Sequence, residues 1–491
     1  MRRLVRSTAI LGLGSAATVV AAIVRAKILA AWLGPEGTGV LAQLASLTAV
    51  LVPLATLGVG NGLVTLIADA RGKGDPARAV ALERTGLSLA WMLGVGLALL
   101  AMAASPWLAQ AIYRDRAFTW AVLLGAASVP LSAVASLRIS MLQGYQAVRS
   151  LAGLNVAVAV AGIATIVPLA HFFGVQGAVV QLVVIAAFYA VWSGRVLAPH
   201  HPRDLPRPAR RIDRALLRPL LRFGVSALLV GLSSTLTLLV LRSLIVDKLG
   251  LGPNGIYQVC VGVSGLLMPT ILNSITANVW PEIASLASDR DAPPVMRSGV
   301  RLAFLLVTGT TAGILVGAPL WVPLFYSGKF LPALDLLPFQ FLGDYFRAGA
   351  WMFGIWLVPR NRLRPWVLFD VIYGLTLLVA FLLLVDRIGI RSVVIGYVLA
   401  HTTHATLHYL LARRVIGFRL GPDNRRLLLA SLLLLAGLAV WTPRSVLGSA
   451  LGGAALLVWA AVVVRPHEWR AMVGIVRRRL GLSGGPPPVA S

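Results

Sequence analysis

Four cationic residues that lie inside apolar segments are the strongest candidates in this sequence for binding a ligand. Arg25 and Lys27 stand about two turns before the end of the first apolar segment, and Arg242 has nearly the same position in the second half of the chain. Arg347 lies near the middle of a later apolar segment. Charged side chains at such depth are costly and normally face a protein interior or an aqueous cavity. Because a guanidinium is a planar pair of donors that matches phosphate oxygens, these residues indicate a binding site for an anion.

Each of these cations also has a simpler interpretation. Arg25 and Lys27 could extend along their helix toward the membrane surface. Asp344 precedes Arg347 by three residues, so the two could neutralise each other as a pair on one helix face. Both interpretations stay open at the level of the sequence.

Amides and prolines at matching positions of the two halves are further candidates. Asn61 and Asn278 are predicted to meet hydroxyl groups of a ligand, although such amides also bind neighbouring helices. Pro53 and Pro269 fall in the middle of apolar segments, where a proline frees backbone carbonyls and favours a kink. We expect these two prolines to serve gating.

Three histidines, His401, His404 and His408, fall on one face of an expected helix. Such a face could bind a metal ion or carry protons, but no carboxylate in the same helix would orient the imidazoles. We therefore interpret the three as polar residues that face other helices and help them to pack.

No motif of enzyme chemistry stands out in the chain. It has no Gly-Lys-Ser/Thr phosphate loop, no nucleophile elbow and no helix with paired histidines and a glutamate. The one cysteine, Cys260, lies in an apolar run, so there is no disulfide framework and no metal-type spacing. The prediction is a protein that is not an enzyme and that has no metal and no cofactor.

The elements that carry these residues are predicted to be membrane helices. The chain is 58% hydrophobic and only 12% charged, whereas soluble proteins carry about 25% charged residues. The first apolar segment continues to Leu33 with no polar domain behind it, so we expect a retained helix and not a cleaved signal peptide. The fold class is thus an all-α integral membrane protein. Its expected spans, about fourteen, are residues 8–33, 40–67, 83–104, 118–140, 151–172, 176–197, 223–247, 256–280, 299–323, 335–358, 366–386, 392–412, 427–442 and 446–464.

The net charge of +27 follows from topology and does not call for nucleic acid as a partner. With the N-terminus in the cytoplasm, 32 Lys and Arg are assigned to the cytoplasmic side, among them Arg84, Arg195 and Arg301 at the ends of spans, and 7 lie on the opposite side. This asymmetry is the positive-inside rule. We expect both termini and the basic linker in the middle of the chain to be cytoplasmic.

The chain contains an internal repeat. Leu33-Gly34-Pro35-Glu36-Gly37 returns as Leu251-Gly252-Pro253-Asn254-Gly255 at an offset of 218, and similar pairs follow over almost 200 residues. An even number of helices in each repeat makes the repeats parallel, related by an axis along the membrane normal. The predicted domains are an N-terminal six-helix lobe (1–199), a basic cytoplasmic linker (200–222), a C-terminal six-helix lobe (223–413), two extra helices (414–465), and an amphipathic cytoplasmic segment with a disordered tail (466–491).

The first two apolar segments resemble those of a known family. The run Leu33-Gly34-Pro35-Glu36-Gly37-Thr38-Gly39, and the later Gly58-Val59-Gly60-Asn61-Gly62, are similar to the oligosaccharide flippases of the multidrug/oligosaccharidyl-lipid/polysaccharide exporter superfamily, with Wzx-type O-antigen translocases as the nearest comparison. The resemblance covers essentially the whole chain. It implies a V-shaped pair of lobes whose cationic cavity maps onto Arg25, Arg242 and Arg347 by helix and depth.

The resemblance also implies a function. Such proteins move an undecaprenyl-pyrophosphate-linked oligosaccharide across the bacterial cytoplasmic membrane by alternating access, with possible coupling to a proton or sodium gradient. The expected partners are this anionic lipid-linked cargo, membrane lipids, and the glycan polymerase and chain-length machinery, and the expected state is a monomer. Two alternatives stay open. One is a multidrug or cation antiporter of the same superfamily, which would need a membrane-embedded carboxylate. The other is a membrane glycosyltransferase or polymerase, which would need a sizeable outer loop.

Overall fold

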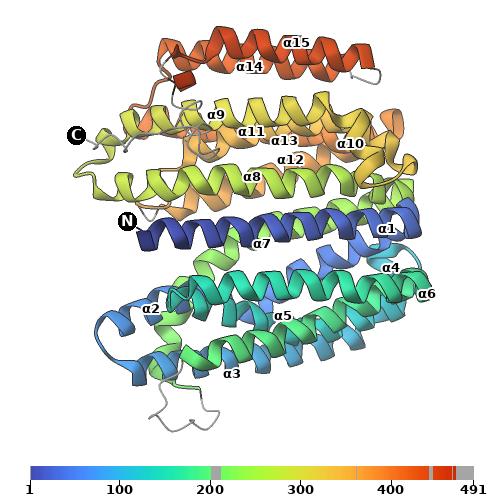
Figure 1. The fold of residues 1–491 in the computed structure, drawn as a ribbon, viewed down its shortest axis with the longest axis vertical. Helices are drawn as coiled ribbons and strands as arrows, with labels where there is room; N and C mark the ends of the chain where they lie inside the picture. Colours follow the sequence, from blue (N-terminus) through green and yellow to red (C-terminus); the bar gives the residue numbers. More distant parts are fainter. Residues whose placement is uncertain (1, 201–211, 361, 442–445, 467, 471–491) are drawn as a thin grey trace.

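The described residues of the computed structural model, 2–200, 212–360, 362–441, 446–466 and 468–470, are helical apart from short turns (Figure 1). No strand occurs among them. The N-terminal helices are α1 (Arg2–Thr56), α2 (Gly60–Gly72), α3 (Pro76–Ala103), α4 (Ser105–Tyr113), α5 (Thr119–Gly144) and α6 (Val148–Leu197). The C-terminal helices are α7 (Arg214–Leu249), α8 (Leu251–Ser285), α9 (Ala292–Val316), α10 (Ala318–Phe325), α11 (Leu337–Gly354), α12 (Leu363–Ile388), α13 (Arg391–Ile416), α14 (Pro422–Val440) and α15 (Val446–Val463). Four 3₁₀ turns complete the elements: Arg116–Phe118, Ala198–His200, Asp289–Asp291 and Gly328–Asp335.

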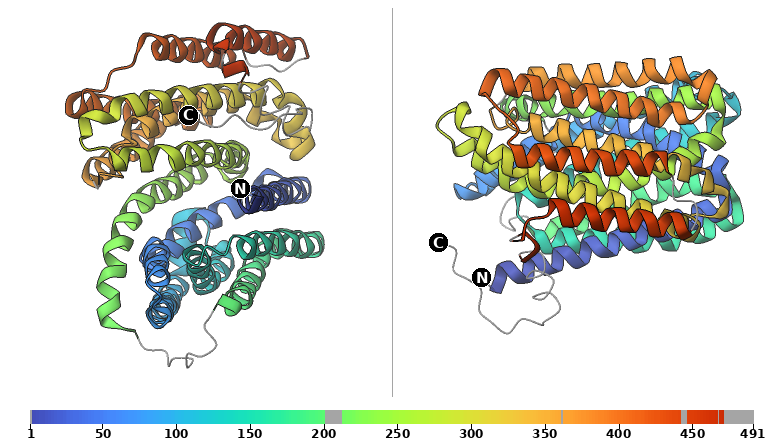
Figure 2. Two further views of the ribbon diagram at one scale, coloured as in Figure 1. Left: turned by 60° about the vertical axis from the view of Figure 1, so that its left-hand side comes forward. Right: turned by 90° about the horizontal axis from the view of Figure 1, so that it is seen from above.

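The helices form two lobes, each with its own apolar core (Figure 1). The first core is built mainly from α1 to α6, and the second from α7 to α15. Helix α7 belongs to both, since Leu220 lies in the first core and Leu241 in the second. Figure 2 (left) shows this helix running from one lobe to the other. The expected domain boundary at residue 223 therefore falls inside a helix that links the lobes, and residues 201–211 of the linker lie outside the described residues.

Helices α14 and α15 lie at one edge of the molecule, beyond α9 (Figure 1). The guanidinium of Arg301 in α9 donates to the carboxylate of Glu468, just after α15, with Nη2 2.8 Å from Oε2. This hydrogen bond holds the pKa of the Glu468 carboxyl below its usual range. Asn424, at the start of α14, also donates to the Arg297 carbonyl (2.9 Å), so polar contacts attach the extra helices to the C-terminal lobe. The amphipathic segment expected after residue 466 lies almost wholly outside the described residues.

Four glycines in the left-handed region reverse the chain between paired helices. They are Gly34 (φ 64°), Gly174 (φ 56°), Gly250 (φ 91°) and Gly389 (φ 56°). A side chain is disfavoured at such φ values, and glycine is not. Gly34 thus divides α1 into two helices, and Gly174 divides α6 in the same way.

These turns correct the alignment of the internal repeat. Gly34 and Gly250 are 216 residues apart and Gly174 and Gly389 are 215 apart, whereas the motif comparison gave 218. The offset of 218 at this turn is wrong by two residues, because Gly252 lies inside α8 and does not form the turn. Chain reversal needs a positive φ at one position, and a local match of Leu-Gly-Pro does not show which glycine has it.

The two lobes touch closely at the end of the bundle that carries Gly34 and Gly250. A Cβ built on Gly39 would lie 2.1 Å from the Leu251 carbonyl oxygen, and one on Gly255 would lie 1.8 Å from the Pro35 oxygen. These contacts are symmetric at an offset of 216. The Asn254 amide donates to the Gly39 carbonyl (3.0 Å), and Gln43 donates to Ser243 (2.8 Å). In this structure the lobes are therefore joined at the Gly34 end.

Seven helices of the described chain are long and apolar enough to cross a membrane. Two of them, residues 18–56 and 148–200, each contain one of the glycine reversals. Twelve of the fourteen expected spans fall on one helix or on half of a divided helix, whereas 40–67 covers the end of α1 together with α2, and 299–323 covers α9 together with α10. The all-helical membrane class is confirmed, and the number of crossings stays a prediction.

Candidate functional site

A cavity of about 420 Å³ opens inside the C-terminal lobe, between α7, α8, α11, α12 and α13. Its wall combines aromatic rings with ionisable and hydroxyl groups, which is unusual for helices of such apolar composition. The polar and aromatic lining residues are Ser234, Thr235, Thr237, Tyr257, Ser264, Gln340, Arg347, Trp351, Trp366, Asp370, Tyr373, Tyr397, His401, His404 and His408. Of the four cations expected at the site, Arg347 is the one on this wall.

Arg347 is only loosely held by its neighbour in α11. Its Nη1 atom lies 3.9 Å from Oδ1 of Asp344, whose side chain is fully buried, while the Arg347 side chain is 37% exposed. The Asp344 carboxylate accepts hydrogen bonds from Tyr397 (2.9 Å) and from Ser264. The carboxylate is thus satisfied mainly by hydroxyl groups, and the guanidinium keeps donors that face the cavity. The expected pair with Asp344 exists, and it leaves the Arg347 side chain partly exposed on the cavity wall.

The three histidines line the same cavity. His404 Nε2 lies 3.1 Å from His408 Nε2 and 3.5 Å from Oδ1 of Asp370, a residue of α12. Our interpretation of the histidines considered only their own helix, and the carboxylate beside them comes from the next one. Asp370 was not among the predicted site residues, although a carboxylate inside the expected span 366–386 is itself a signal.

Arg25 and Lys27 lie elsewhere. The Arg25 guanidinium donates to Oε1 of Gln181 in α6 (2.9 Å), within the N-terminal lobe. Lys27 donates through Nζ to the Pro323 carbonyl in α10 (3.1 Å), which connects the two lobes. Neither lines the cavity that contains Arg347. The structure does not bring these cations together, because α1 turns their side chains toward helices that pack on it.

Arg242 is a buried connector between helices. Only 1% of the residue is exposed, and its Nη1 donates to the Asn254 side chain (2.9 Å) while Nη2 donates to Gln258. The side-chain amide nitrogen of Asn254 in turn donates a hydrogen bond to the carbonyl oxygen of Gly39 in the other lobe. Burial against these two amides leaves the guanidinium no direct access to a ligand in this structure.

The amide and proline candidates lie at other places on the helices. Asn61 and Asn278 are exposed, outside the cavity wall, and Asn278 donates to the Ser274 carbonyl of its own helix (3.1 Å). Helix α1 continues through Pro53 and α8 through Pro269. The backbone changes course instead at Gly34, at Gly250 and at Leu57–Gly58. Whether the two prolines act in gating stays a prediction.

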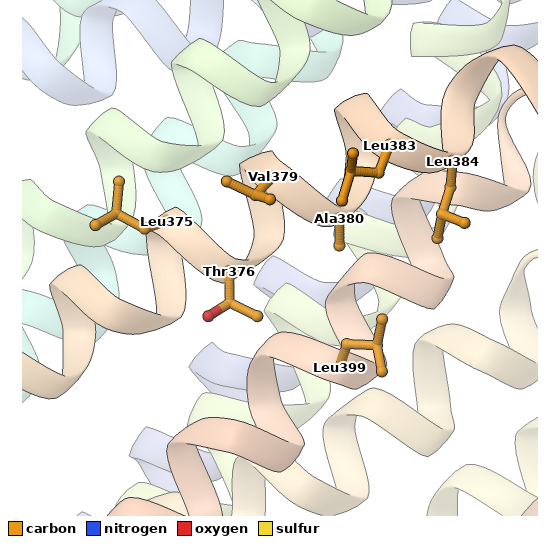
Figure 3. Close-up of a pocket in the computed structure, with 7 residues that line it drawn as sticks. All are labelled: Leu375, Thr376, Val379, Ala380, Leu383, Leu384 and Leu399. Carbon is orange, nitrogen blue, oxygen red and sulfur yellow. The ribbon is translucent and has the colours of Figure 1, made fainter.

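A second hollow, of about 490 Å³, lies on the outside of α12 and α13 and is shown in Figure 3. Thr376 is the single polar side chain on its wall, and the other lining residues are aliphatic. Such a wall has no donor for an anion. It contrasts with the polar cavity on the inner side of the same helices.

Comparisons with known proteins bear on this architecture. The family model described as a polysaccharide biosynthesis protein matches residues 4–286. The chain belongs to this family. The lipid III flippase of Escherichia coli (strain K12) is a relative of this chain. The two sequences are 25% identical over 364 residues, which are 72% of this chain and 85% of the flippase.

Solved structures show the fold. A multidrug resistance MATE family transporter of the MOP superfamily, in an inward-facing conformation, superposes with a TM-score of 0.69 at 18% identity, over 82% of this chain and 94% of the transporter. The lipid II flippase MurJ, in an inward closed conformation, superposes with a TM-score of 0.68 at 11% identity, over 96% of this chain and 99% of that protein. These superpositions agree with the fold predicted for this chain. These relatives are named as flippases and transporters, in agreement with the prediction that the chain is not an enzyme.

Proposed function

We propose that this protein is a flippase that moves an undecaprenyl-pyrophosphate-linked oligosaccharide from the inner to the outer leaflet of the bacterial cytoplasmic membrane. The observation that carries this proposal is the partly exposed Arg347 guanidinium on a polar cavity inside an apolar helical bundle. A pyrophosphate that leaves the headgroup region loses its hydration and needs replacement donors, which a guanidinium supplies. Membership of a polysaccharide biosynthesis family and the similarity to a lipid III flippase point to the same class of cargo.

Alternating access would follow from the way the lobes are joined. The close contacts of Gly39 and Gly255 lie at one end of the bundle, and the lobes have separate cores. Two rigid bodies that are joined at one end can rock to open that end and close the other. In this proposal the Gly34 end faces the outside, as the distribution of Lys and Arg predicts. Both termini and the linker are then cytoplasmic, and cysteine labelling at the linker from either side of the membrane tests this orientation.

A multidrug or cation antiporter is the second candidate. It is favoured by the carboxylates of Asp344 and Asp370, which lie in and beside the cavity, and by the MATE-like fold. An antiporter of this kind would depend on the carboxylates more than on the guanidinium. Contacts with a glycan polymerase and chain-length machinery, and a monomeric state, complete the flippase proposal.

The test is a set of Arg347 variants in cells that lack their own flippase. Arg347→Ala should reduce surface glycan roughly tenfold or more at normal membrane abundance, because hydrogen bonds to a charged group are lost. Arg347→Lys should restore part of the export, since it keeps the charge without the planar donor pair.

Arg387→Ala is the matched control, since Arg387 is an exposed arginine of the same lobe. It should leave surface glycan unchanged. Normal glycan with Arg347→Ala would overturn the role of this arginine. Retained glycan export together with lost drug resistance would favour the antiporter.

A further inference from the structure

The polar cavity contains a group of atoms that share protons. His404 Nε2 contacts both His408 Nε2 (3.1 Å) and Oδ1 of Asp370 (3.5 Å). An imidazole nitrogen either donates one hydrogen or accepts one. When His404 Nε2 carries the hydrogen, both the Asp370 carboxylate and the second imidazole are within reach as acceptors. Asp370 also accepts a hydrogen bond from the side chain of Trp366, which holds the carboxylate in place.

The other ring nitrogens of the histidines are free to take a hydrogen. The Nδ1 atoms of His401, His404 and His408 are buried and have no hydrogen-bond partner, and the three residues are 6%, 8% and 1% exposed. A proton added at Nδ1 would make His404 an imidazolium directly beside the Asp370 carboxylate. Buried polar atoms without partners are uncommon and call for an explanation.

The carboxylates at the cavity offset the charge of such a proton. With neutral histidines, Arg347 is one positive charge against two carboxylates, Asp344 and Asp370. One further proton brings this group to neutrality, and burial of an uncompensated charge is costly. Arg242 does not enter this balance directly, since its guanidinium lies 5.6 Å from the Tyr257 ring and is bound to amides of α8.

The remaining groups that face the site do not supply a second cation. They are, by helix, Thr235 and Thr237 of α7, Tyr257 and Ser264 of α8, Gln340, Asp344 and Arg347 of α11, Asp370 and Tyr373 of α12, and Tyr397, His401 and His408 of α13. A sodium ion is a poorer occupant than a proton, because hard cations prefer oxygen ligands and the converging atoms include two imidazole nitrogens.

We propose that His404 and Asp370 form a binding site for one exchangeable proton, and that this proton favours the binding of an anion at Arg347. The first part goes beyond the proposed function and does not depend on the cargo. The second part rests on it, since it takes Arg347 as the anion site. Linkage makes the effect reciprocal: an anion that binds better to the protonated cavity also tightens the binding of the proton.

The test uses the full-length protein in lipid nanodiscs with ¹³C-labelled histidine. The chain has seven histidines, so the signal of His404 is identified by its loss in His404→Gln. This signal should shift between about pH 8 and about pH 5 in the wild type and should lose that shift in Asp370→Asn. His171→Gln, which removes a histidine of α6 outside the cavity, is the control and should change only its own signal. A His404 signal that does not respond to pH, or that responds equally in Asp370→Asn, would overturn the proton site.

The linkage is tested with inorganic pyrophosphate as the probe. Pyrophosphate should raise the proton affinity of the His404 site by about tenfold in the wild type and should have no effect in Arg347→Gln. An equal effect in both proteins would mean binding elsewhere on this basic chain and would overturn the linkage. These measurements need no glycan and therefore do not test the flippase proposal. That proposal would fail in the cell experiment, if the Arg347 variants showed normal surface glycan.

Discussion

At the scale of single residues, similar arginines have different surroundings and therefore different expected roles. Arg347 has a carboxylate at 3.9 Å and a cavity beside it, whereas Arg242 is enclosed by amide oxygens. Both lie deep within apolar segments of the sequence, so depth alone does not separate them. What separates them is that the Arg242 guanidinium is buried against neighbouring amides, whereas the Arg347 guanidinium is partly exposed on a cavity wall.

This difference predicts opposite phenotypes for the two residues. Arg242→Ala should lower the free energy of unfolding by about 3 kcal/mol, since it removes hydrogen bonds from a charged group and takes this donor from the side-chain oxygens of Asn254 and Gln258. The measurement is thermal unfolding of the detergent-purified protein, together with membrane abundance. Arg347→Ala serves as the comparison and should unfold near the wild-type temperature. A stable Arg242→Ala protein that has lost export would mean that this arginine also meets the cargo.

At the scale of the element, the reversals between paired helices depend on glycine for two separate reasons. Gly174 needs its left-handed backbone, and nothing lies within 4 Å of a Cβ built on it. Gly177, one turn later, has helical dihedrals, but its Cβ would lie 1.9 Å from the Leu169 carbonyl oxygen. The first glycine is required by conformation and the second by close packing.

The two glycines give a matched pair of variants. Gly174→Ala should cost about 1–2 kcal/mol of stability, the strain of a left-handed alanine. Gly177→Ala should cost more and should lower expression, because backbone has to move to remove the clash. Melting temperatures and yields of the two variants, prepared in parallel, check this order. Equal stability of both proteins would contradict the packing of the two halves of α6.

At the scale of the whole molecule, the close crossing of Gly39 and Gly255 joins the lobes at the Gly34 end. Lys27 with Pro323, and Arg114 with Asp247 (2.9 Å), add contacts near the same reversals. The lobes share few other direct contacts of this kind in the described chain, apart from those made by α7. Rocking of the lobes that opens the Gly34 end would therefore begin by separating these backbone contacts.

A side chain at this crossing should shift the conformational equilibrium toward lobes that are separated at the Gly34 end. Gly255→Ala should separate the lobes at the Gly34 end, since its Cβ would meet the Pro35 carbonyl oxygen. Spin labels on Trp107 and Leu331, which are exposed on opposite lobes, should report longer distances in this variant. Cys260→Ala removes the native thiol first.

The control for this measurement is Gly153→Ala. A Cβ at Gly153 in α6 meets nothing within 4 Å, so the distance distribution should match that of the parent protein. An unchanged distribution in Gly255→Ala would contradict a role of the crossing in closure.

The sequence by itself determined the membrane class, the two lobes and the approximate positions of the helices. Apolar runs and the bias of Lys and Arg are local quantities, and they depend little on how the helices pack. The repeat was also visible, although its offset was wrong by two residues at Gly250, where only the backbone shows which glycine reverses the chain. Arg347 could be selected because a cation in an apolar span is rare at any position.

Tertiary structure decided which of the polar residues share a site. Arg25 and Arg242 looked equivalent to Arg347 in the sequence, yet their donors are directed to Gln181 and Asn254. Asp370 reaches His404 from a different helix, so spacing along α13 could not reveal the pair. The physical reason is that a helix periodicity gives the face on which a side chain lies, and the rotation and neighbours of that helix are set by packing against distant parts of the chain.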